Sequence, residues 1–170
     1  PGFDAIIDLI KMVMYKFPAS GGKPQKLPIP AEELDNANRL HNELVEKAAE
    51  NDENLMALYF DKGNLDEDEL REGIKIGMMK HQVFPVFCLS GKKDMGSGRL
   101  MGFIDNVAPS AVDMPAEILE DGTEVKCDPK DPARLFVFKT LVEPHLGKLT
   151  LFKVMSGEVT VGMEFFNEKT

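Results

Sequence analysis

The clearest hydrophobic pattern in the chain has a helical period and lies between residues 31 and 49. Its apolar positions recur at steps of three and four residues, and they are Leu34, Ala37, Leu40, Leu44, Val45, Ala48 and Ala49, with His41 on the same stripe. This spacing places them on one face of an α-helix. Pro30 stands where a first-turn proline is tolerated, and Glu32 and Glu33 suit the positive end of a helix. The pattern therefore predicts an amphipathic helix from about Ala31.

Two further helices are predicted immediately downstream. A short helix that stops near Gly63 is favoured by a group of apolar residues, which are Leu55, Met56, Leu58 and Tyr59. Asp66 can then cap a third helix, because Glu69 three residues later completes a variant of the capping box. The buried stripe of that helix consists of Leu70, Ile74 and Met78. Together the three helices form an acidic helical block over roughly residues 31–81.

The segments that flank this block favour strands and loops. Residues 3–17 mix β-branched, apolar and charged positions, and we interpret them as a strand. Residues 18–30 contain four prolines and two glycines, which restricts them to loop or sheet edge. Residues 83–89 form an apolar run without alternation, as in a strand that is covered on both faces. A helix is expected to follow over residues 98–107.

The last third of the chain changes from helical to strand-like patterns. Residues 110–133 are rich in proline and show no sustained period, so they are predicted to be a linker. Strands are then expected in three runs, RLFVFKTLVEP, GKLTLFKVMSGEVTVG and MEFFN, with Gly147 and Gly157 at turns. So few strands cannot close a barrel, and their edges should be left unpaired.

Composition and charge narrow the classes of function. With 43% hydrophobic and 29% charged residues, the chain of 170 residues has the material for a buried core. Its net charge of −9 opposes non-specific electrostatic binding of nucleic acid, and we expect no DNA partner. The excess is local, because residues 31–72 hold 14 acidic and four basic residues, a net charge of −10. This acidic stretch is either an ordinary solvated face or a surface that binds another protein.

The residues that most often carry chemistry form no catalytic or metal-binding pattern. Cys88 and Cys127 give neither a disulfide framework nor a metal spacing, and we expect Cys88 to be a buried thiol in a reducing, cytoplasmic compartment. His41, His81 and His145 lie far apart in the sequence, and His41 is interpreted as a core residue. No apolar run approaches the roughly 18 residues of a membrane helix. We therefore predict no catalytic residue, no metal site and no membrane partner.

The loop that follows the apolar run is the strongest candidate for binding a ligand. It reads SGKKDMGSG, and Ser90 and Gly91 open it. A phosphate-binding P-loop is excluded, because Lys93 stands where Ser or Thr is required and Val86 where a glycine is required. The loop nevertheless lies at the carboxyl end of a predicted strand, where ligands of open α/β sheets bind. A backbone N–H of Ser90 or Gly91 can donate to O6 of guanine; alternatively, the two residues simply end a strand.

Three stretches of the sequence resemble elongation factor G. The run FPVFCLSGKKDMGSGRLMGFIDNVAPS looks like the final strand, the guanine-contacting Ser-Ala loop and the closing helix of its GTPase domain. IPAEELDNANRLHNELVEKAAENDENLMALYF and LDEDELREGIKIGMMKHQ resemble its inserted subdomain, and FVFKTLVEPHLGKLTLFKVMSGEVTVG is similar to the opening strands of its β-barrel domain. The resemblance runs in order over nearly the whole chain. Gly91 in place of the family's alanine, and Leu89 where glycine is usual, indicate a divergent paralogue.

The resemblance implies a fold class and a division into domains. The class is mixed α/β (α+β): the carboxyl part of a P-loop GTPase domain with an inserted acidic helical subdomain, followed by the first strands of a β-barrel domain. The implied parts are the inserted subdomain (1–82), the last strand, guanine loop and helix of the GTPase domain (83–109), the linker (110–133) and the incomplete barrel domain (134–170).

The resemblance also implies a function for a longer parent protein. That protein would be a ribosome-bound translational GTPase that drives translocation of tRNA and mRNA, with ribosomal RNA and the large-subunit stalk protein as partners. GTP or GDP with Mg would be its cofactors, and Ser90 and Gly91 would contact the guanine base. This chain lacks the phosphate loop and the magnesium motif, which are expected upstream, so alone it should be inactive and bind no cofactor.

Other interpretations of the same residues stay open. Lys92, Lys93 and Lys126 can touch ribosomal RNA or simply form soluble surface. The whole chain can be a free-standing acidic protein-interaction module. It can also belong to a ribosome-protection or release-type relative of the same GTPase family.

Overall fold

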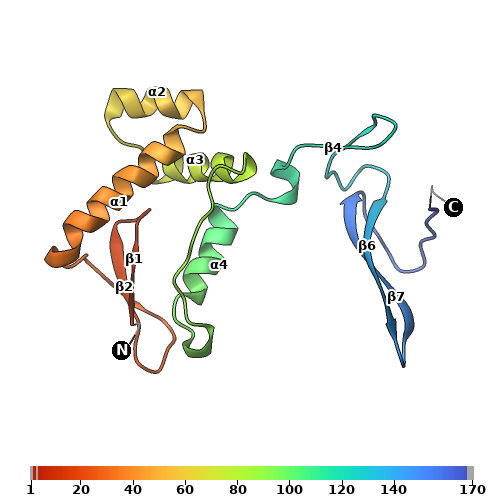
Figure 1. Ribbon diagram of the computed structural model, residues 1–170, viewed down its shortest axis with the longest axis horizontal. Coiled ribbons are helices and arrows are strands. Elements are labelled where there is room, and N and C mark those ends of the chain that lie inside the picture. The colour runs from red at the N-terminus through yellow and green to blue at the C-terminus, as the bar shows by residue number, and fades with distance from the viewer. Residues whose placement is uncertain (1, 3, 168–170) are drawn as a thin grey trace. The chain divides into compact units, whose positions relative to one another are not determined.

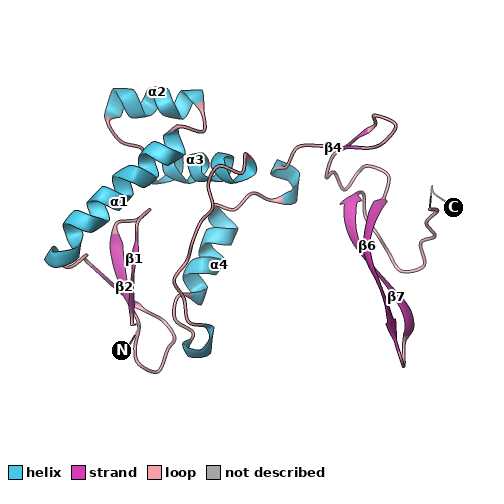
Figure 2. Cartoon of the chain, viewed as in Figure 1, coloured by secondary structure: helices cyan, strands magenta, loops and turns pink. Residues whose placement is uncertain are grey.

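The chain divides into two compact units, Pro1–Pro109 and Ser110–Thr170, and the computed structural model describes residue 2 and residues 4–167 (Figure 1). Within these described residues, the first unit contains four α-helices and a three-stranded sheet, and the second contains two small two-stranded sheets (Figure 2). The predicted mixed α/β class is therefore confirmed. Within the described residues, no sheet closes into a barrel.

The sheet of the first unit is antiparallel, with its strands in the order β1-β2-β3. They are β1 (Ala5–Asp8), β2 (Val13–Lys16) and β3 (Gln25–Leu27). The single strand predicted over residues 3–17 is wrong, because a turn divides it into a hairpin; residue 3 lies outside the described residues. The Asp8 carboxylate accepts the Ile10 and Lys11 N–H groups at 3.1 and 3.0 Å, and Met12 adopts a φ of 49°. A side chain that bonds to the backbone just downstream favours a turn over a continuous strand.

The three predicted helices of the acidic block are confirmed. They are α1 (Ala31–Ala49), α2 (Glu53–Lys62) and α3 (Glu67–Met79). The Asp66 side chain accepts the N–H of Glu69 while the Glu69 side chain accepts the N–H of Asp66, which is the reciprocal capping box. Gly63 ends α2 with a φ of 71°, in the left-handed region that glycine adopts at low cost.

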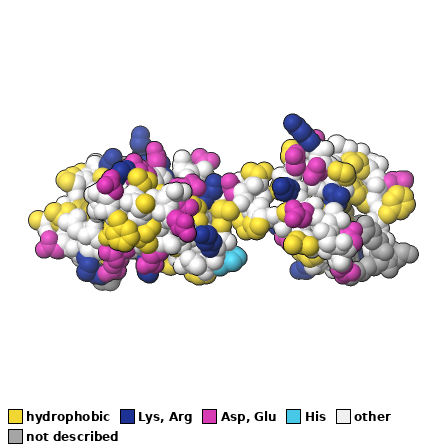
Figure 3. Space-filling view, turned by 90° about the horizontal axis from the view of Figure 1, so that it is seen from above, with side chains coloured by type: hydrophobic (Ala, Val, Ile, Leu, Met, Phe, Trp, Pro, Cys, Tyr) yellow, Lys and Arg dark blue, Asp and Glu magenta, His cyan; other side chains and the backbone are white. Residues whose placement is uncertain are grey.

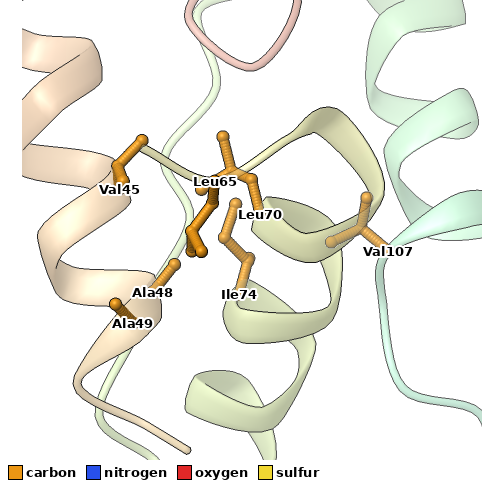
Figure 4. Packing of buried hydrophobic residues seen from close by; sticks show 7 residues of the cluster. All are labelled: Val45, Ala48, Ala49, Leu65, Leu70, Ile74 and Val107. Carbon is orange, nitrogen blue, oxygen red and sulfur yellow. The ribbon is translucent and has the colours of Figure 1, made fainter. Parts of the chain in front are cut away.

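The main core of the first unit lies where α1 and α3 cross (Figure 4). Its buried side chains are Val45, Ala48 and Ala49 from α1, Leu65 before α3, Leu70 and Ile74 from α3, and Val107. The helices approach so closely that a Cβ on Gly73 would lie 2.7 Å from the Ala48 carbonyl oxygen. Buried Asn51 bonds across this contact, since its side chain donates to the carbonyls of Lys47 at 2.6 Å and Gly73 at 3.3 Å.

Residues 83–89 run as a loop into the candidate site, and the strand predicted there is wrong. A strand exists only when its N–H and C=O groups pair with a neighbour, and no strand within the described residues pairs with this segment. Two of its side chains are largely exposed, Phe84 at 74% and Val86 at 90%. The helix expected next is confirmed as α4 (Ser97–Asn106), which begins one residue earlier than predicted.

The second unit consists of a small hairpin and a longer ribbon. The hairpin pairs β4 (Glu117–Ile118) with β5 (Glu124–Val125), so the predicted linker contains a short sheet. The ribbon pairs β6 (Arg134–Glu143) with β7 (Gly147–Ser156), in antiparallel register with an irregularity between Val137 and Lys139. The strand expected in MEFFN is wrong, because residues 163–167 have no regular structure.

Candidate functional site: the Ser90–Gly91 loop

Ser90 and Gly91 open a tight loop that closes on itself through backbone hydrogen bonds. Ser90 and Met95 form an isolated antiparallel bridge, in which the Ser90 N–H donates to the Met95 oxygen at 2.8 Å and the Met95 N–H donates back at 3.0 Å. Between them, Gly91–Lys93 form one turn of 3-10 helix, and the Lys93 N–H donates to the Ser90 oxygen at 3.2 Å. These hydrogen bonds give the loop a defined conformation.

Burial of Met95 fixes this loop to the sheet. Met95 is only 1% exposed and packs with Tyr15 and Phe17 of the β2 segment in a second, smaller core. Gly96 follows with a φ of 86°, and a Cβ there would lie 3.1 Å from the Cys88 oxygen. Any larger residue at position 96 would combine a strained backbone with a close contact, so a glycine is required at this point of the loop.

A second set of contacts joins α4 and the loop to the hairpin. The Arg99 guanidinium lies over the Tyr15 ring, 4.5 Å from its centroid, and donates a hydrogen bond to the Tyr15 hydroxyl at 3.0 Å. Gly21, in the loop after β2, sits against the Lys93 carbonyl, where a Cβ would come within 2.1 Å of the oxygen. Sequence analysis did not find Tyr15, Met95 or Arg99.

The two predicted donors differ in availability. The Ser90 N–H is already used by the Met95 carbonyl. The Gly91 N–H, by contrast, donates a hydrogen bond to no other group among the described residues. Gly91 is exposed, and a Cβ placed on it would meet no atom within 4 Å. Of the two N–H groups, the one on Gly91 is therefore the one free to bond to a ligand.

The residues on either side of this pair are at the surface. Lys92 and Lys93 are both exposed. The expectation that Cys88 is a buried thiol is wrong, because Cys88 is exposed. The cause is the same as for the missing strand: no neighbouring strand covers residues 83–89.

All four basic residues of the acidic stretch 31–72 are engaged in ion pairs. The pairs are Arg39–Glu43, Lys47–Glu50, Lys62–Glu69 and Arg71 with Glu67 and Asp68. The remaining acidic residues thus leave an excess of negative charge. In Figure 3, acidic side chains are scattered among basic and hydrophobic ones on the face of the first unit turned to the viewer, so the charge does not gather there in one patch.

Contacts within the helical block also shift pKa values. The Lys62 ammonium donates to the Glu69 carboxylate at 2.6 Å, which raises the pKa of Lys62 and, with the Asp66 N–H, lowers the pKa of Glu69. Burial, together with the nearby Glu46 carboxylate, raises the pKa of Tyr59. All of these contacts lie within the helical block and involve no residue of the Ser90–Gly91 loop.

The other residues considered for chemistry remain separate. Within the described residues, no group of three or more His, Cys, Asp or Glu side chains is placed to hold a metal ion. His41 is half-buried, and its Nδ1 lies 2.7 Å from the carbonyl oxygen of Leu9, which ties α1 to the β1–β2 turn. None of the helices in the described part of the chain has the length and apolar character to cross a membrane.

Comparison with known proteins identifies a fold relative. No family model matches the chain. Its fold is similar to that of the crystal structure of ttk003000868 from Thermus thermophilus, with a TM-score of 0.67 and 22% sequence identity. The match covers 89% of this chain but 21% of that one, so this chain spans about a fifth of the length of the Thermus protein. At this identity the likeness establishes a shared fold and nothing about activity.

Proposed function

We propose that this chain is part of an elongation-factor-G-like translational GTPase that acts on the ribosome in tRNA and mRNA translocation. In this proposal the chain supplies the base-contacting loop, and the groups that bind phosphate and magnesium lie elsewhere in the parent protein. The resemblance of the loop, the acidic helices and the ribbon to that family, in the same order along the chain, motivates the assignment.

The observation that carries the proposal is the free Gly91 N–H. It is presented by a loop whose shape is fixed by the Ser90–Met95 bridge and by buried Met95. A fixed N–H donor pairs with O6 of guanine, whereas adenine presents an amino group at the same position and is rejected. The exposed Gly91 thus supports selection of a guanine nucleotide over an adenine nucleotide.

The partners follow from the same proposal. GTP or GDP with Mg would bind the parent protein, and the uncompensated acidic residues of α1–α3 would face a basic surface of the stalk protein of the large ribosomal subunit. Lys92, Lys93 and Lys126, which are exposed, are candidates for contact with ribosomal RNA. A cytoplasmic location belongs to this proposal, because ribosomes work there.

A matched pair of substitutions in the parent protein tests the role of Gly91. Gly91→Pro removes the N–H, while Gly91→Ala keeps it and meets no neighbouring atom. Ser90 has a φ of −126° and a ψ of 100°, close to the conformation that residues before proline prefer. Loss of one hydrogen bond of about 1 kcal/mol should weaken GDP binding by roughly fivefold in Gly91→Pro only. Equal GDP affinities of the two variants would remove Gly91 from the base site.

The size of the native gene product tests the proposal as a whole. An antibody raised against this chain should detect a protein several times heavier than 18.9 kDa, and that protein should hydrolyse GTP faster in the presence of ribosomes. A native product near 18.9 kDa would instead favour the free-standing acidic interaction module.

A further inference from the structure

A pocket of about 250 Å³ lies in the first unit, lined by the later residues of the Ser90–Gly91 loop but not by Ser90 or Gly91 themselves. Three segments form its walls: Phe17 at the end of the β2 segment, residues 22–24, and residues 94–99 at the start of α4. Ligand pockets for drug-sized molecules usually measure about 300–1,000 Å³. This pocket therefore suits a small group better than a whole nucleotide.

Two cationic side chains line the pocket without a carboxylate partner. Within the part of the chain that the structure describes, Lys23 and Arg99 form no ion pair, although the four bases of residues 31–72 are all paired. Arg99 is held by the Tyr15 ring and uses one N–H on the Tyr15 hydroxyl. A guanidinium carries five N–H donors, so others remain for a ligand. Arg99 is thus pre-oriented while most of its hydrogen-bonding capacity is unused.

The single acidic group in the pocket is already engaged. The Asp94 carboxylate accepts the Ser97 hydroxyl at 2.8 Å. Side-chain charge in the pocket consequently sums to one net positive charge, in a chain whose overall charge is −9. The pocket is thus a local positive site in a chain whose surface is otherwise mainly negative.

The glycines that line the pocket leave its main chain accessible to a ligand. Gly22 and Gly98 both line the pocket, and a Cβ on either would meet no atom within 4 Å. An oxyanion can therefore approach the main chain closely at both positions. The first turn of α4 adds the positive end of a helix of 10 residues, which reinforces the two side chains.

We propose that this pocket is a binding site for a phosphate group, held by Lys23 and Arg99 against the backbone of residues 22 and 96–98. The phosphate belongs either to free inorganic phosphate or to a phosphodiester of RNA, which present the same oxygens to the pocket. The site uses neither Ser90 nor Gly91, so it does not depend on the GTPase assignment.

The test is an NMR titration of the 170-residue chain with inorganic phosphate, at constant ionic strength adjusted with chloride. We expect saturable shifts of the backbone amides of Gly22, Gly96 and Gly98. Lys23→Gln should weaken binding by about tenfold, as for loss of a hydrogen bond to a charged group. Lys130→Gln removes the same charge from the other unit and should leave the affinity unchanged. Shifts that do not saturate, or equal weakening by both substitutions, would overturn the site.

Gly98→Glu separates binding from folding. A glutamate in the first turn of α4 favours the helix, so the variant should fold, yet its carboxylate would repel the anion. We expect a preserved amide spectrum away from the pocket and complete loss of the phosphate-dependent shifts. Phosphate affinity equal to that of the parent chain in this variant would refute the proposal.

A second titration, with a short single-stranded oligouridylate, identifies the source of the phosphate. Tighter binding of the oligonucleotide with shifts at the same three glycines assigns the site to RNA backbone; shifts with inorganic phosphate alone assign it to the free ion. The phosphate titration uses no nucleotide and tests Lys23 and Gly98, whereas GDP binding to Gly91 variants of the parent protein tests the GTPase proposal, so the two proposals can fail separately.

Discussion

The helices α1–α3 and the ribbon β6–β7 place their hydrophobic residues in opposite ways. In the helical region Val45 and Leu70 are each 1% exposed, whereas Phe138 and Val142 of the ribbon are 60% and 80% exposed. Three helices can bury their apolar stripes against one another. Two paired strands have only each other, and both faces of the ribbon remain open to other contacts.

This difference shows where the stability of the chain comes from. The helical region has cap residues, a buried core and a close helix crossing of its own. The ribbon has ladder hydrogen bonds and cross-strand pairs such as Val137 with Phe152, but within the described residues none of its hydrophobic side chains belongs to a buried cluster. An isolated two-stranded ribbon is marginally stable at best. Ordering of the ribbon therefore depends on contacts beyond those two strands.

The largest expected difference is between truncating a buried leucine of the helices and truncating a leucine of the ribbon. Leu70→Ala removes a fully buried side chain and should destabilise the helices by about 2–5 kcal/mol. Leu151→Ala is the matched control in the ribbon, where Leu151 is 37% exposed, and should cost less than about 1 kcal/mol. Urea unfolding followed by far-ultraviolet circular dichroism measures both. Equal costs would mean that the ribbon has a core comparable to that of the helices.

An intermediate effect is expected at the crossing of α1 and α3. Gly73→Ala forces a Cβ to within 2.7 Å of the Ala48 oxygen, and overpacking of this kind should cost about 1–3 kcal/mol. Gly102→Ala in α4 makes the same chemical change where the Cβ meets nothing within 4 Å, and should stabilise by about 0.5–1 kcal/mol. Opposite signs in thermal unfolding would confirm the close crossing; a stabilising Gly73→Ala would argue against it.

The smallest effect concerns pH. The pKa of Glu69 is lowered in the folded state by Lys62 and by the Asp66 N–H, so its contribution is present at neutral pH and is lost as the pH falls through that lowered pKa. Glu69→Gln should therefore melt at a lower temperature than the parent chain at neutral pH, and this difference should become smaller in acid. Asp121→Asn is the counterpart in the second unit, because hydrogen bonds from Thr123 lower the pKa of Asp121. A deficit of Glu69→Gln that grows in acid would contradict this account.

Local signals were enough to predict the helices. Pro30, Asp66 and Gly63 act on the backbone within a few residues of themselves. The residues that begin or end these helices can therefore be recognised from the local sequence. The strand predicted over residues 83–89 failed for the converse reason. A strand requires a partner, and hydrophobicity in one segment says nothing about whether another segment is there to pair with it.

The candidate site was predictable only in part. Ser90 and Gly91 were found because a polar turn follows an apolar run, but the use of the Ser90 N–H by the Met95 carbonyl is a contact across the loop. The Tyr15–Arg99 contact joins residues that are 84 positions apart. Contacts at that separation arise from the packing of the hairpin against α4, for which no short motif exists.

The anchoring of Met95 has a mechanical consequence. The Met95 side chain packs against Tyr15 and Phe17, and the Met95 backbone forms two hydrogen bonds with Ser90. The sheet, Met95 and the Ser90–Gly91 loop are therefore mechanically coupled. Displacement of β2 must either pull Met95 out of its apolar contacts or carry Ser90 along with it. A partner that pushes on the hairpin therefore also re-aims the Gly91 N–H.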